Sequence, residues 1–401
     1  MNKRVAVIIS PNYKDYAKKY LAECFLSIKK QDYADEMKVF ITDNESTEES
    51  FEYVKKILEI PLTPFNKGGN YEIIRNKDND GFAKGNNDAI KKALEQGFDY
   101  IALFNMDTVL GSDCVKKMVE AAEIQPPLPP SCPNDARQND SVGLAVGQVS
   151  GGWKIGAVQA RLMLYKKNLT PTSPYKGEGI INSLGNVTHF LGFGYAKGYG
   201  EEYKSPQPPL LKGVEICYPS GAAVLFKREV LEKVGLFDEE FWMYNEDQDI
   251  GWRIWLSGLK CVLAPEAVVY HKYEFSRSIK KYYWMDRNRI LSILKNYHLA
   301  TLVLIFPAFL VMEIGLIFFA VSGGWFKEKI NVYKYFLSLK NWRYIIKTRR
   351  QTQKLRLVKD KDIIKLFSGK IWYQEIGDAR LKIANIVFGT YWRIARVLIR
   401  W

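Results

Sequence analysis

Polar side chains follow three predicted strands at the point where each strand ends. The pairs are Val5–Ile9 with Ser10-Pro11-Asn12-Tyr13, Val39–Thr42 with Asp43-Asn44, and Tyr100–Phe104 with Asn105-Met106-Asp107. In a parallel sheet these segments converge on one edge, which is where open α/β sheets bind their ligands. Acidic and amide side chains at that edge can contact a ribose, the edge of a base, or a metal ion held by a diphosphate.

Asp107 is the sharpest of these signals, because a carboxylate leaving a buried strand suits a hard divalent cation that also bridges phosphates. A segment rich in glycine and asparagine, residues 81–87 (GFAKGNN), precedes the helix that leads into the same strand. This segment lacks the Gly-Lys-Ser/Thr ending of a Walker loop and the Gly-x-Gly-x-x-Gly spacing of a dinucleotide site. Both of those phosphate-binding motifs are therefore excluded.

A second group of motifs lies further along the chain. It consists of Tyr218–Ala223 (YPSGAA), Gly235–Arg253 with Glu246-Asp247 inside it, and Pro265–His271 (PEAVVYH). Together with the strand-end motifs, this ordered set resembles glycosyltransferase family 2, in the rhamnosyltransferase-like branch that elongates bacterial surface polysaccharides. The resemblance covers roughly residues 3–300, and it rests on the order of several motifs that are each weak alone.

The resemblance implies a GT-A fold and an inverting transfer of sugar from a nucleotide diphosphate. Asp43 would contact the base and Asn105 the ribose, while Asp107 and His271 would hold a divalent metal, Mg²⁺ or Mn²⁺. Asp247 would be the general base, because inversion needs one carboxylate to take the proton of the acceptor hydroxyl. The remaining implied contacts are Ser10, Pro11, Asn12, Asn44, Gly81 and Asn86 with the nucleotide sugar, and Gly221, Trp242 and Glu246 with the acceptor.

Each of these residues also has a structural interpretation. The segment Asp43–Thr47 is compatible with an ordinary turn and a helix N-cap. His271 ends a strand and is compatible with a buried structural histidine. Glu246-Asp247 could be a solvated helix start, and Asp249 with Arg253 has the spacing of a structural ion pair. Asn105 stands where the family's first aspartate is expected, so Asp107 is the only carboxylate of that motif.

The elements that must position these residues alternate between strand and helix through the first hundred residues. This alternation predicts a Rossmann-like, doubly wound α/β fold with a mostly parallel central sheet. Further strands are predicted at Ile155–Leu164 and Val224–Phe226, and further helices at Arg228–Val234 and 246–257. We expect a catalytic domain over residues 1–278, interrupted by mobile insertions at about 125–152 and 201–212.

Residues 279–401 have a different character, and we expect them to form a basic helical region associated with a membrane. They hold 24 basic and 7 acidic residues, a net charge of +17, whereas residues 1–278 have a net charge of −3. The apolar segment 299–321 is long enough to cross a bilayer and has Glu313 as its one charge. Since both flanks are basic, a re-entrant pair of half-helices hinged at Pro307 is slightly favoured over a plain span. The mixture of aromatic and basic residues at 342–356 and 383–401 predicts helices that lie in the membrane interface. For residues 383–401, a helix packed on the catalytic domain explains the pattern nearly as well.

Composition limits the remaining choices. The five cysteines are scattered and form no Cys-x-x-Cys pair, which favours reduced thiols facing a cytosol over a disulfide framework or a zinc finger. No signal peptide is expected, because Val5–Ile9 is only as long as a strand. A nucleic-acid partner is disfavoured, because the overall charge of +14 is concentrated beside the apolar segment.

The sequence therefore predicts a membrane-associated inverting glycosyltransferase at the bacterial inner membrane, with its catalytic domain in the cytoplasm. The favoured donor is dTDP-rhamnose, with UDP-galactofuranose or another hexose donor second. The expected acceptor is a saccharide linked to a polyprenyl diphosphate. The alternatives are a transferase that charges polyprenyl phosphate itself and a catalytically silent membrane scaffold with the same fold. The oligomeric state stays open.

Overall fold

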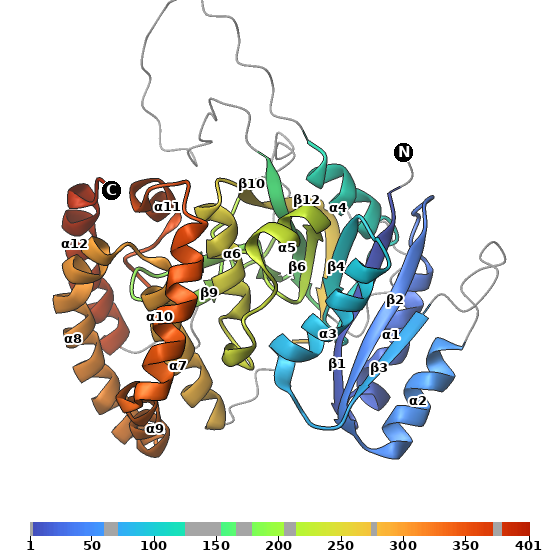
Figure 1. Cartoon of the computed structure of the whole chain (residues 1–401), viewed down its shortest axis with the longest axis horizontal. Helices are drawn as coiled ribbons and strands as arrows, with labels where there is room; N and C mark the ends of the chain where they lie inside the picture. The colour runs from blue at the N-terminus through green and yellow to red at the C-terminus, as the bar shows by residue number, and fades with distance from the viewer. Residues whose placement is uncertain are drawn as a thin grey trace, which may run out of the picture.

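The computed structural model describes residues 3–59, 71–124, 154–165, 179–203, 214–273, 279–371 and 379–401 (Figure 1). The predicted insertion at 125–152 and most of the one at 201–212 lie outside these residues. Four of the five cysteines fall within them, and all four are buried free thiols: Cys24, Cys114, Cys217 and Cys261.

A central sheet with the strand order β10-β12-β6-β11-β4-β1-β2-β3 organises the chain. Strands β1, β2, β3, β4, β6 and β12 run in one direction, and β11 runs against them. The predicted α/β class with a mostly parallel central sheet is therefore confirmed. The strands are β1 (Val5–Lys14), β2 (Met37–Ser46), β3 (Tyr71–Asn76), β4 (Tyr100–Phe104), β5 (Thr108–Leu110), β6 (Ile155–Leu164), β7 (Ile181–Ser183), β8 (Asn186–Thr188), β9 (Gly194–Ala196), β10 (Val214–Glu215), β11 (Ala223–Lys227) and β12 (Lys260–His271).

Both faces of the sheet are covered, which explains why β1 begins as an unbroken apolar run. Val5, Val7 and Ile9 pack on one face, and Ala6 and Ile8 pack on the other. Helices α1 (Tyr16–Lys29), α2 (Glu48–Leu58) and α4 (Cys114–Ala122) cover the first face. Helices α3 (Gly81–Glu95), α5 (Arg228–Val234) and α6 (Glu246–Leu256) cover the second.

The C-terminal helices extend the layer formed by α6, on the side of the molecule away from β3 (Figure 1). Buried residues of α8 and α12 belong to the same apolar cluster as one face of the sheet. These helices are α7 (Lys280–Asn296), α8 (Leu299–Ser322), α9 (Phe326–Leu337), α10 (Leu339–Lys354), α11 (Asp360–Ile363) and α12 (Ala379–Leu398). The predicted domain boundary at residue 278 falls just before α7, in the undescribed segment 274–278.

Helix α8 corrects one prediction, because it is a single helix that continues through Pro307. Proline lacks an amide hydrogen and so removes one helical hydrogen bond. The turns on both sides of it are nevertheless held by Ile305 and Ala308, which are buried in the core. The re-entrant pair of half-helices is therefore wrong. Within the described residues α8 is the one helix long and apolar enough to cross a bilayer, with a mean hydropathy of 2.6.

Glu313, the one charge of α8, lies in a buried cluster of four charged side chains. Its carboxylate contacts the Arg289 guanidinium, and Lys329 Nζ lies 2.7 Å from both Glu313 and Asp286. Asp286 also lies 2.7 Å from Arg289. Two positive and two negative charges from α7, α8 and α9 thus neutralise one another away from water. The cluster fixes α8 to its neighbours at its middle.

Removing one member of this cluster should be costly, because the remaining charges stay buried without full compensation. We expect Glu313→Gln to lower the free energy of unfolding by about 3–5 kcal/mol, measured by chemical denaturation in detergent. Glu232→Gln is the matched control, since Glu232 pairs with Arg228 at 2.8 Å on the surface. The control should cost less than about 1 kcal/mol. Equal losses in the two variants would contradict this account of the cluster.

Candidate functional site

The predicted polar residues of β1 and β2 do meet at the carboxyl edge of the sheet. Both strands run further than predicted, and Asn12 pairs in register with Asp43. The Asn12 amide donates to Asp43 Oδ1 at 2.8 Å and to Ser50 Oγ at 3.2 Å, and its oxygen accepts from the Ala17 N–H at 2.9 Å. Asn12 thus orients Asp43 and has no hydrogen-bonding group left over for a ligand.

Two neighbouring predicted residues also serve the architecture. The Asn44 amide donates to the Gly81 carbonyl at 2.9 Å and accepts from Asn76 at 3.0 Å. Pro11 packs against α3 at Gly85, where an added Cβ would lie 2.4 Å from the proline ring. Asn44 and Pro11 therefore join α3 to the ends of β1 and β2, and so place the glycine-rich segment at the edge.

Three buried oxygen atoms along this edge have no hydrogen-bond partner in the described structure. They are Asp43 Oδ2, Asn105 Oδ1 and Asp107 Oδ1, and the Asn86 amide oxygen in α3 is a fourth of the same kind. Arg75 Nε lies 3.9 Å from Asp43 Oδ2 and His271 Nε2 lies 3.2 Å from Asp107 Oδ1, so these two carboxylates have a basic neighbour without accepting a hydrogen bond from it. Leaving a buried acceptor unpaired costs about 1–3 kcal/mol, so such atoms are rare in native proteins. Their concentration at one edge indicates a site whose ligand supplies donors or a cation.

Asp107 and His271 are brought together by strand pairing. Strand β5 pairs antiparallel with the end of β12 so that Thr108 lies opposite His271. This places His271 Nε2 3.2 Å from Asp107 Oδ1. Ser10 Oγ supports the same turn by accepting from the Met106 N–H at 2.9 Å.

The His271 ring is oriented by a residue that the motifs did not indicate. Its Nδ1 lies 3.0 Å from the amide oxygen of Asn182, which lies in β7. In the tautomer that carries its hydrogen on Nδ1, Nδ1 donates to Asn182 and Nε2 presents a lone pair toward Asp107 Oδ1. Two acceptors that face each other in this way fit a shared cation. A hard divalent ion commonly uses few protein ligands and completes its shell with water and substrate phosphate.

Tyr16, in α1, is a second residue that the motifs missed. Burial, the Asp107 charge and a hydrogen bond to Asp107 hold the pKa of Tyr16 far above its ordinary value, so the phenol stays protonated. Tyr13 stacks on Tyr16 with ring centroids 5.2 Å apart, and it is partly exposed. Across the described residues, no group of three or more histidine, cysteine and acidic side chains gathers as a closed metal cage.

Asp247 lies in the first turn of α6 and is half-buried. Its Oδ2 accepts from the Gly221 N–H at 3.2 Å, and its Oδ1 accepts from the Gln248 N–H at 2.8 Å. The neighbouring Ala222 carbonyl accepts from the Asn105 N–H at 3.0 Å. The dipeptide 221–222 therefore connects Asp247 to the turn after β4, where Asn105 and Asp107 lie. Gly221, predicted to contact an acceptor, is in this structure a support for Asp247.

Burial raises the pKa of Asp247 to about 6, although hydrogen bonds from the backbone N–H groups of Gly221, Gln248 and Asp247 itself oppose the shift. Glu246 is buried more deeply, and desolvation together with the charge of Asp247 raises its pKa well above the ordinary value. Its Oε2 has no hydrogen-bond partner among the described residues. Near neutral pH, the pair therefore presents an ionised Asp247 beside a more weakly acidic Glu246.

The loop before Asp247 has an unusual backbone. Trp242, Tyr244 and Asn245 have φ angles of 58°, 70° and 64°, in the left-handed region that non-glycine residues avoid. The Asn288 amide of α7 holds the loop by donating to the carbonyls of Phe241, Met243 and Tyr244 at 2.7–2.8 Å. Strain of this kind persists only where surrounding contacts impose it.

Trp242 joins the loop to two helices. Its carbonyl accepts from the Phe82 and Ala83 N–H groups at 2.8 and 3.1 Å, at the start of α3. Gly81 allows this approach, since it has a φ of 77° and an added Cβ would lie 2.6 Å from Trp242. The Trp242 ring stacks on Trp284 of α7 with centroids 4.8 Å apart. The C-terminal helices thus contribute directly to the shape of the candidate site.

Asp249, two residues after Asp247, has a structural role. It is fully buried, its Oδ2 lies 2.9 Å from Arg253 Nε, and its Oδ1 lies 3.0 Å from Lys295 Nζ. Burial raises the pKa of Asp249, but the charges of Lys295 and Arg253 outweigh this effect and lower it to about 2. The predicted ion pair of Asp249 with Arg253 is therefore present.

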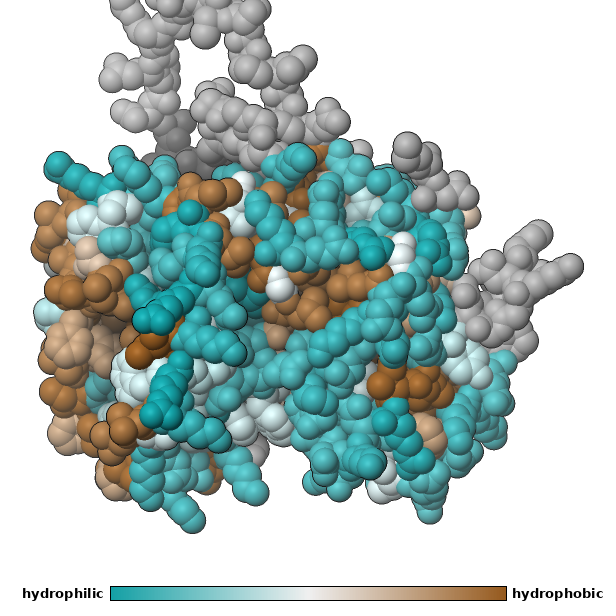
Figure 2. Space-filling view, in the orientation of Figure 1, coloured by the Kyte–Doolittle hydropathy of each residue, from teal (hydrophilic) through white to brown (hydrophobic). Residues whose placement is uncertain are grey.

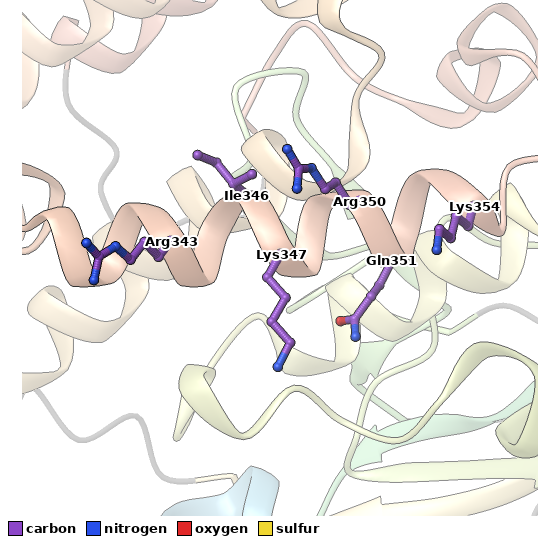
Figure 3. A pocket seen from close by; sticks show the side chains of 6 residues that line it. All are labelled: Arg343, Ile346, Lys347, Arg350, Gln351 and Lys354. Atoms are coloured by element: carbon purple, nitrogen blue, oxygen red, sulfur yellow. The ribbon is translucent and has the colours of Figure 1, made fainter.

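A groove of about 390 Å³ along α10 has a different chemistry (Figure 3). It is lined by Arg343, Ile346, Lys347, Arg350, Gln351 and Lys354. The groove has no acidic residue in its lining and so provides no general base. We place the candidate site at the sheet edge and the Glu246-Asp247 turn instead.

The opposite pKa shifts of two neighbouring carboxylates predict opposite effects on stability. The native state holds the Asp247 proton up to about pH 6, above the ordinary value of 3.8, so the free energy of unfolding falls as pH rises through that window. We expect Asp247→Asn to be more stable than the wild type at pH 7, by about 1–3 kcal/mol, and equally stable below pH 4. Asp249→Asn should instead be less stable at pH 7. Urea denaturation at both pH values measures this, and a loss of stability in Asp247→Asn at pH 7 would contradict it.

Asn288 should control the rigidity of the loop. We expect Asn288→Ala to raise the amide exchange rates of residues 242–245 at least tenfold, because losing the bonds to three carbonyls costs more than about 1.4 kcal/mol. Mass-spectrometric hydrogen exchange measures this directly. Asn385→Ala is the matched control, since Asn385 bonds to the backbone of Ile371, remote from the loop. Unchanged exchange in Asn288→Ala would show that the loop is held by other contacts.

Comparisons with known proteins bear on this geometry. None of the curated proteins matches the sequence. Among solved structures, the GalNAc-T7 complex with UDP, GalNAc and Mn²⁺ is similar with a TM-score of 0.49 and 13% identity, over 74% of this chain. This chain spans about half of that one, 48%.

Two further solved structures are similar over nearly the whole chain. Staphylococcus aureus TarS residues 1–349, in complex with UDP, has a TM-score of 0.43 and 15% identity, covering 98% of this chain and 90% of that one. The mannosyltransferase PcManGT from Pyrobaculum calidifontis, in complex with GDP-Man and Mn²⁺, has a TM-score of 0.42 and 15% identity, covering 100% and 85%.

The family model of glycosyl transferase family 2 matches residues 7–140. That stretch holds Asp43, Asn105 and Asp107, and it ends well before Asp247 and His271. The resemblance to glycosyltransferase family 2 is thereby confirmed over about a third of the chain, the part that carries the strand-end residues.

Proposed function

We propose that this chain is a metal-dependent, inverting glycosyltransferase that uses a nucleoside diphosphate sugar. The observation that carries the proposal is the row of unpaired buried oxygens at Asp43, Asn105 and Asp107, connected through residues 221–222 to the ionised Asp247. A nucleotide sugar supplies what these atoms lack, since its base and ribose offer N–H and O–H donors and its diphosphate brings a cation.

Each residue has a separate task in the proposed reaction. Asp43 Oδ2 accepts from the base, and Asn105 Oδ1 accepts from the ribose. Asp107 and His271 would hold Mg²⁺ or Mn²⁺, which supplies positive charge against the departing diphosphate. Asp247 accepts the proton of the acceptor hydroxyl as that oxygen attacks the anomeric carbon, and the burial that raises its pKa makes it a stronger base than an exposed aspartate.

The finer assignments come from the motifs and from the C-terminal helices. The favoured donor is dTDP-rhamnose, followed by UDP-galactofuranose or another hexose donor, as the rhamnosyltransferase-like motifs imply. The acceptor is a saccharide carried on a polyprenyl diphosphate. The basic, apolar region from residue 279 onward supports action on that lipid at the cytoplasmic face of a bacterial inner membrane. Trp242, stacked on Trp284, offers an aromatic surface for the acceptor next to Glu246-Asp247.

The test is release of nucleotide from a panel of nucleotide sugars with Mg²⁺ or Mn²⁺ and a lipid-linked acceptor extract. Asp247→Asn should lower kcat at least 100-fold while donor binding, measured by calorimetry, changes less than threefold. Asp107→Ala should weaken metal-dependent donor binding itself. For the wild type, kcat/KM should rise with pH and level off above about pH 6, because only ionised Asp247 accepts the proton.

Glu232→Gln, a surface change in α5, is the control and should leave turnover unchanged. Equal turnover in Asp247→Asn and the wild type would show that another group is the base. Metal-dependent donor binding without turnover of any donor or acceptor would favour a silent scaffold with the same fold. Turnover with polyprenyl phosphate alone would reassign the acceptor.

A further inference from the structure

The outer surface of α8 is an unpartnered apolar stripe. Its exposed side chains recur every three or four residues from one end of the helix to the other: Val303, Phe306, Leu310, Ile314, Phe318 and Val321. Val303 is 69% exposed and Phe318 is 71% exposed. Figure 2 shows these hydrophobic residues gathered along the edge of the molecule formed by α8 and α12.

Helix α12 widens this stripe into a face. It packs on α8, with the Tyr391 hydroxyl bonded to the Leu304 carbonyl and the Trp401 indole donating to Thr301 Oγ1 at 2.8 Å. Its own exposed apolar residues include Ile383, Ile386, Ile394 and Val397. We call the combined surface of α8 and α12 the apolar face. Soluble monomers rarely leave a contiguous apolar surface of this extent exposed to water.

A row of positive charge borders the apolar face. Lys382, Arg393 and Arg396 are exposed, and their spacings of eleven and three residues place them on one flank of α12. Arg400, two residues beyond the end of α12, is exposed as well. The α12 side chain bonded to α8, Tyr391, lies on the other flank. None of these four cations has an acidic partner in the described part of the chain. An apolar stripe beside a basic row is the pattern of a helix that lies in the headgroup region of an anionic bilayer.

The packing of α8 decides how it meets a membrane. The side opposite the apolar stripe is buried along its whole length, through Thr301, Ile305, Ala308, Met312 and Ala320. A crossing α8 would have to carry α7, α9 and α12 into the hydrocarbon region with it. These three helices bear many lysine and arginine side chains, which are costly at that depth.

We propose that the apolar face docks flat into one leaflet of an anionic bilayer, so that α8 lies in the membrane plane and does not cross it. This deepens the membrane association of the proposed function and rests on it for the lipid-linked acceptor. The apolar face sinks to the level of the upper acyl chains, and the basic row of α12 meets the phosphate headgroups. The catalytic sheet stays on the same side of the bilayer as both ends of α8.

The first test is flotation of the full chain with lipid vesicles, in a Cys132→Ser background that retains the buried cysteines. Vesicles of phosphatidylcholine with 30% phosphatidylglycerol should bind the chain, and pure phosphatidylcholine should bind it at least tenfold less. The triple variant Val303→Glu, Ile314→Glu, Phe318→Glu should lose binding at least tenfold with an unchanged melting temperature. Leu26→Gln, in an exposed apolar residue of α1, is the control and should bind like the wild type.

The second test separates a flat helix from a crossing one. A fluorophore attached to a cysteine at Leu299, Leu310 or Val321 reports depth through lipids that carry quenchers at known positions. A flat α8 gives one shallow depth at all three positions. A deepest reading at Leu310, with shallow readings at both ends, would show that α8 crosses the bilayer and would overturn the proposal.

Two further outcomes would also overturn it. The first is that the chain binds neither kind of vesicle. The second is that the wild type is a dimer and the triple variant is a monomer, because a second copy of the chain would then cover the apolar face. Light scattering after gel filtration detects such a dimer. Neither readout requires sugar transfer, and nucleotide release with a short water-soluble acceptor should be retained in the triple variant. Failure of docking is thus distinguishable from failure of the proposed function.

Discussion

The hydrogen bonds from the Asn288 amide to the carbonyl groups of Phe241, Met243 and Tyr244 are the constraint on which the site depends. They hold a loop in which Trp242, Tyr244 and Asn245 have positive φ angles that their side chains disfavour. Because of that conformation, the Trp242 carbonyl reaches the first amides of α3, and α6 begins with Glu246 and Asp247 at the sheet edge. A contact from α7, outside the α/β sheet and its covering helices, thus determines where the candidate base lies.

Two aspartates in the first turn of α6, Asp247 and Asp249, have opposite electrostatic environments. Among the described residues, Asp247 accepts hydrogen bonds from backbone N–H groups alone, whereas Asp249, two residues later, has Arg253 and Lys295 as direct partners. In the first arrangement no cation occupies the carboxylate, so it stays free to accept a proton, and burial makes its ionised form less stable. In the second arrangement two cations hold the carboxylate ionised, so it does not act as a base, and its ion pair with Lys295 joins α6 to α7. Buried carboxylates with a raised pKa and no cationic partner are characteristic of functional sites, although they lower the stability of the fold.

The parts of the site that local sequence could predict are those with local causes. Asp43, Asn105 and Asp107 follow strands whose apolar runs are visible in the sequence, and the edge they share follows from parallel pairing. Tyr16, Asn182 and Asn288 could not be predicted, because each reaches the site through the packing of a distant segment. The left-handed loop gave no signal either, since tryptophan, tyrosine and asparagine occupy positions where glycine would have marked the turn.

The fold was predictable to a similar degree and for similar reasons. Buried strands and amphipathic helices appear as periodic patterns, so the α/β class and most elements of the C-terminal region follow from the sequence. The continuity of α8 does not follow, because Pro307 predicts a break unless the packing of Ile305 and Ala308 is known.

The buried charge cluster around Glu313 has a consequence for the order in which the protein is made. On leaving the ribosome, α8 is an apolar segment with a carboxylate at its middle, and Lys329, one of the two cations that neutralise it, is synthesised only afterwards, on α9. The acidic residue disfavours transfer of α8 into hydrocarbon during that interval. Once α9 folds, Arg289 and Lys329 hold α8 against α7 and α9 through Glu313. Under the proposed flat docking, the chain therefore folds first and meets the bilayer second.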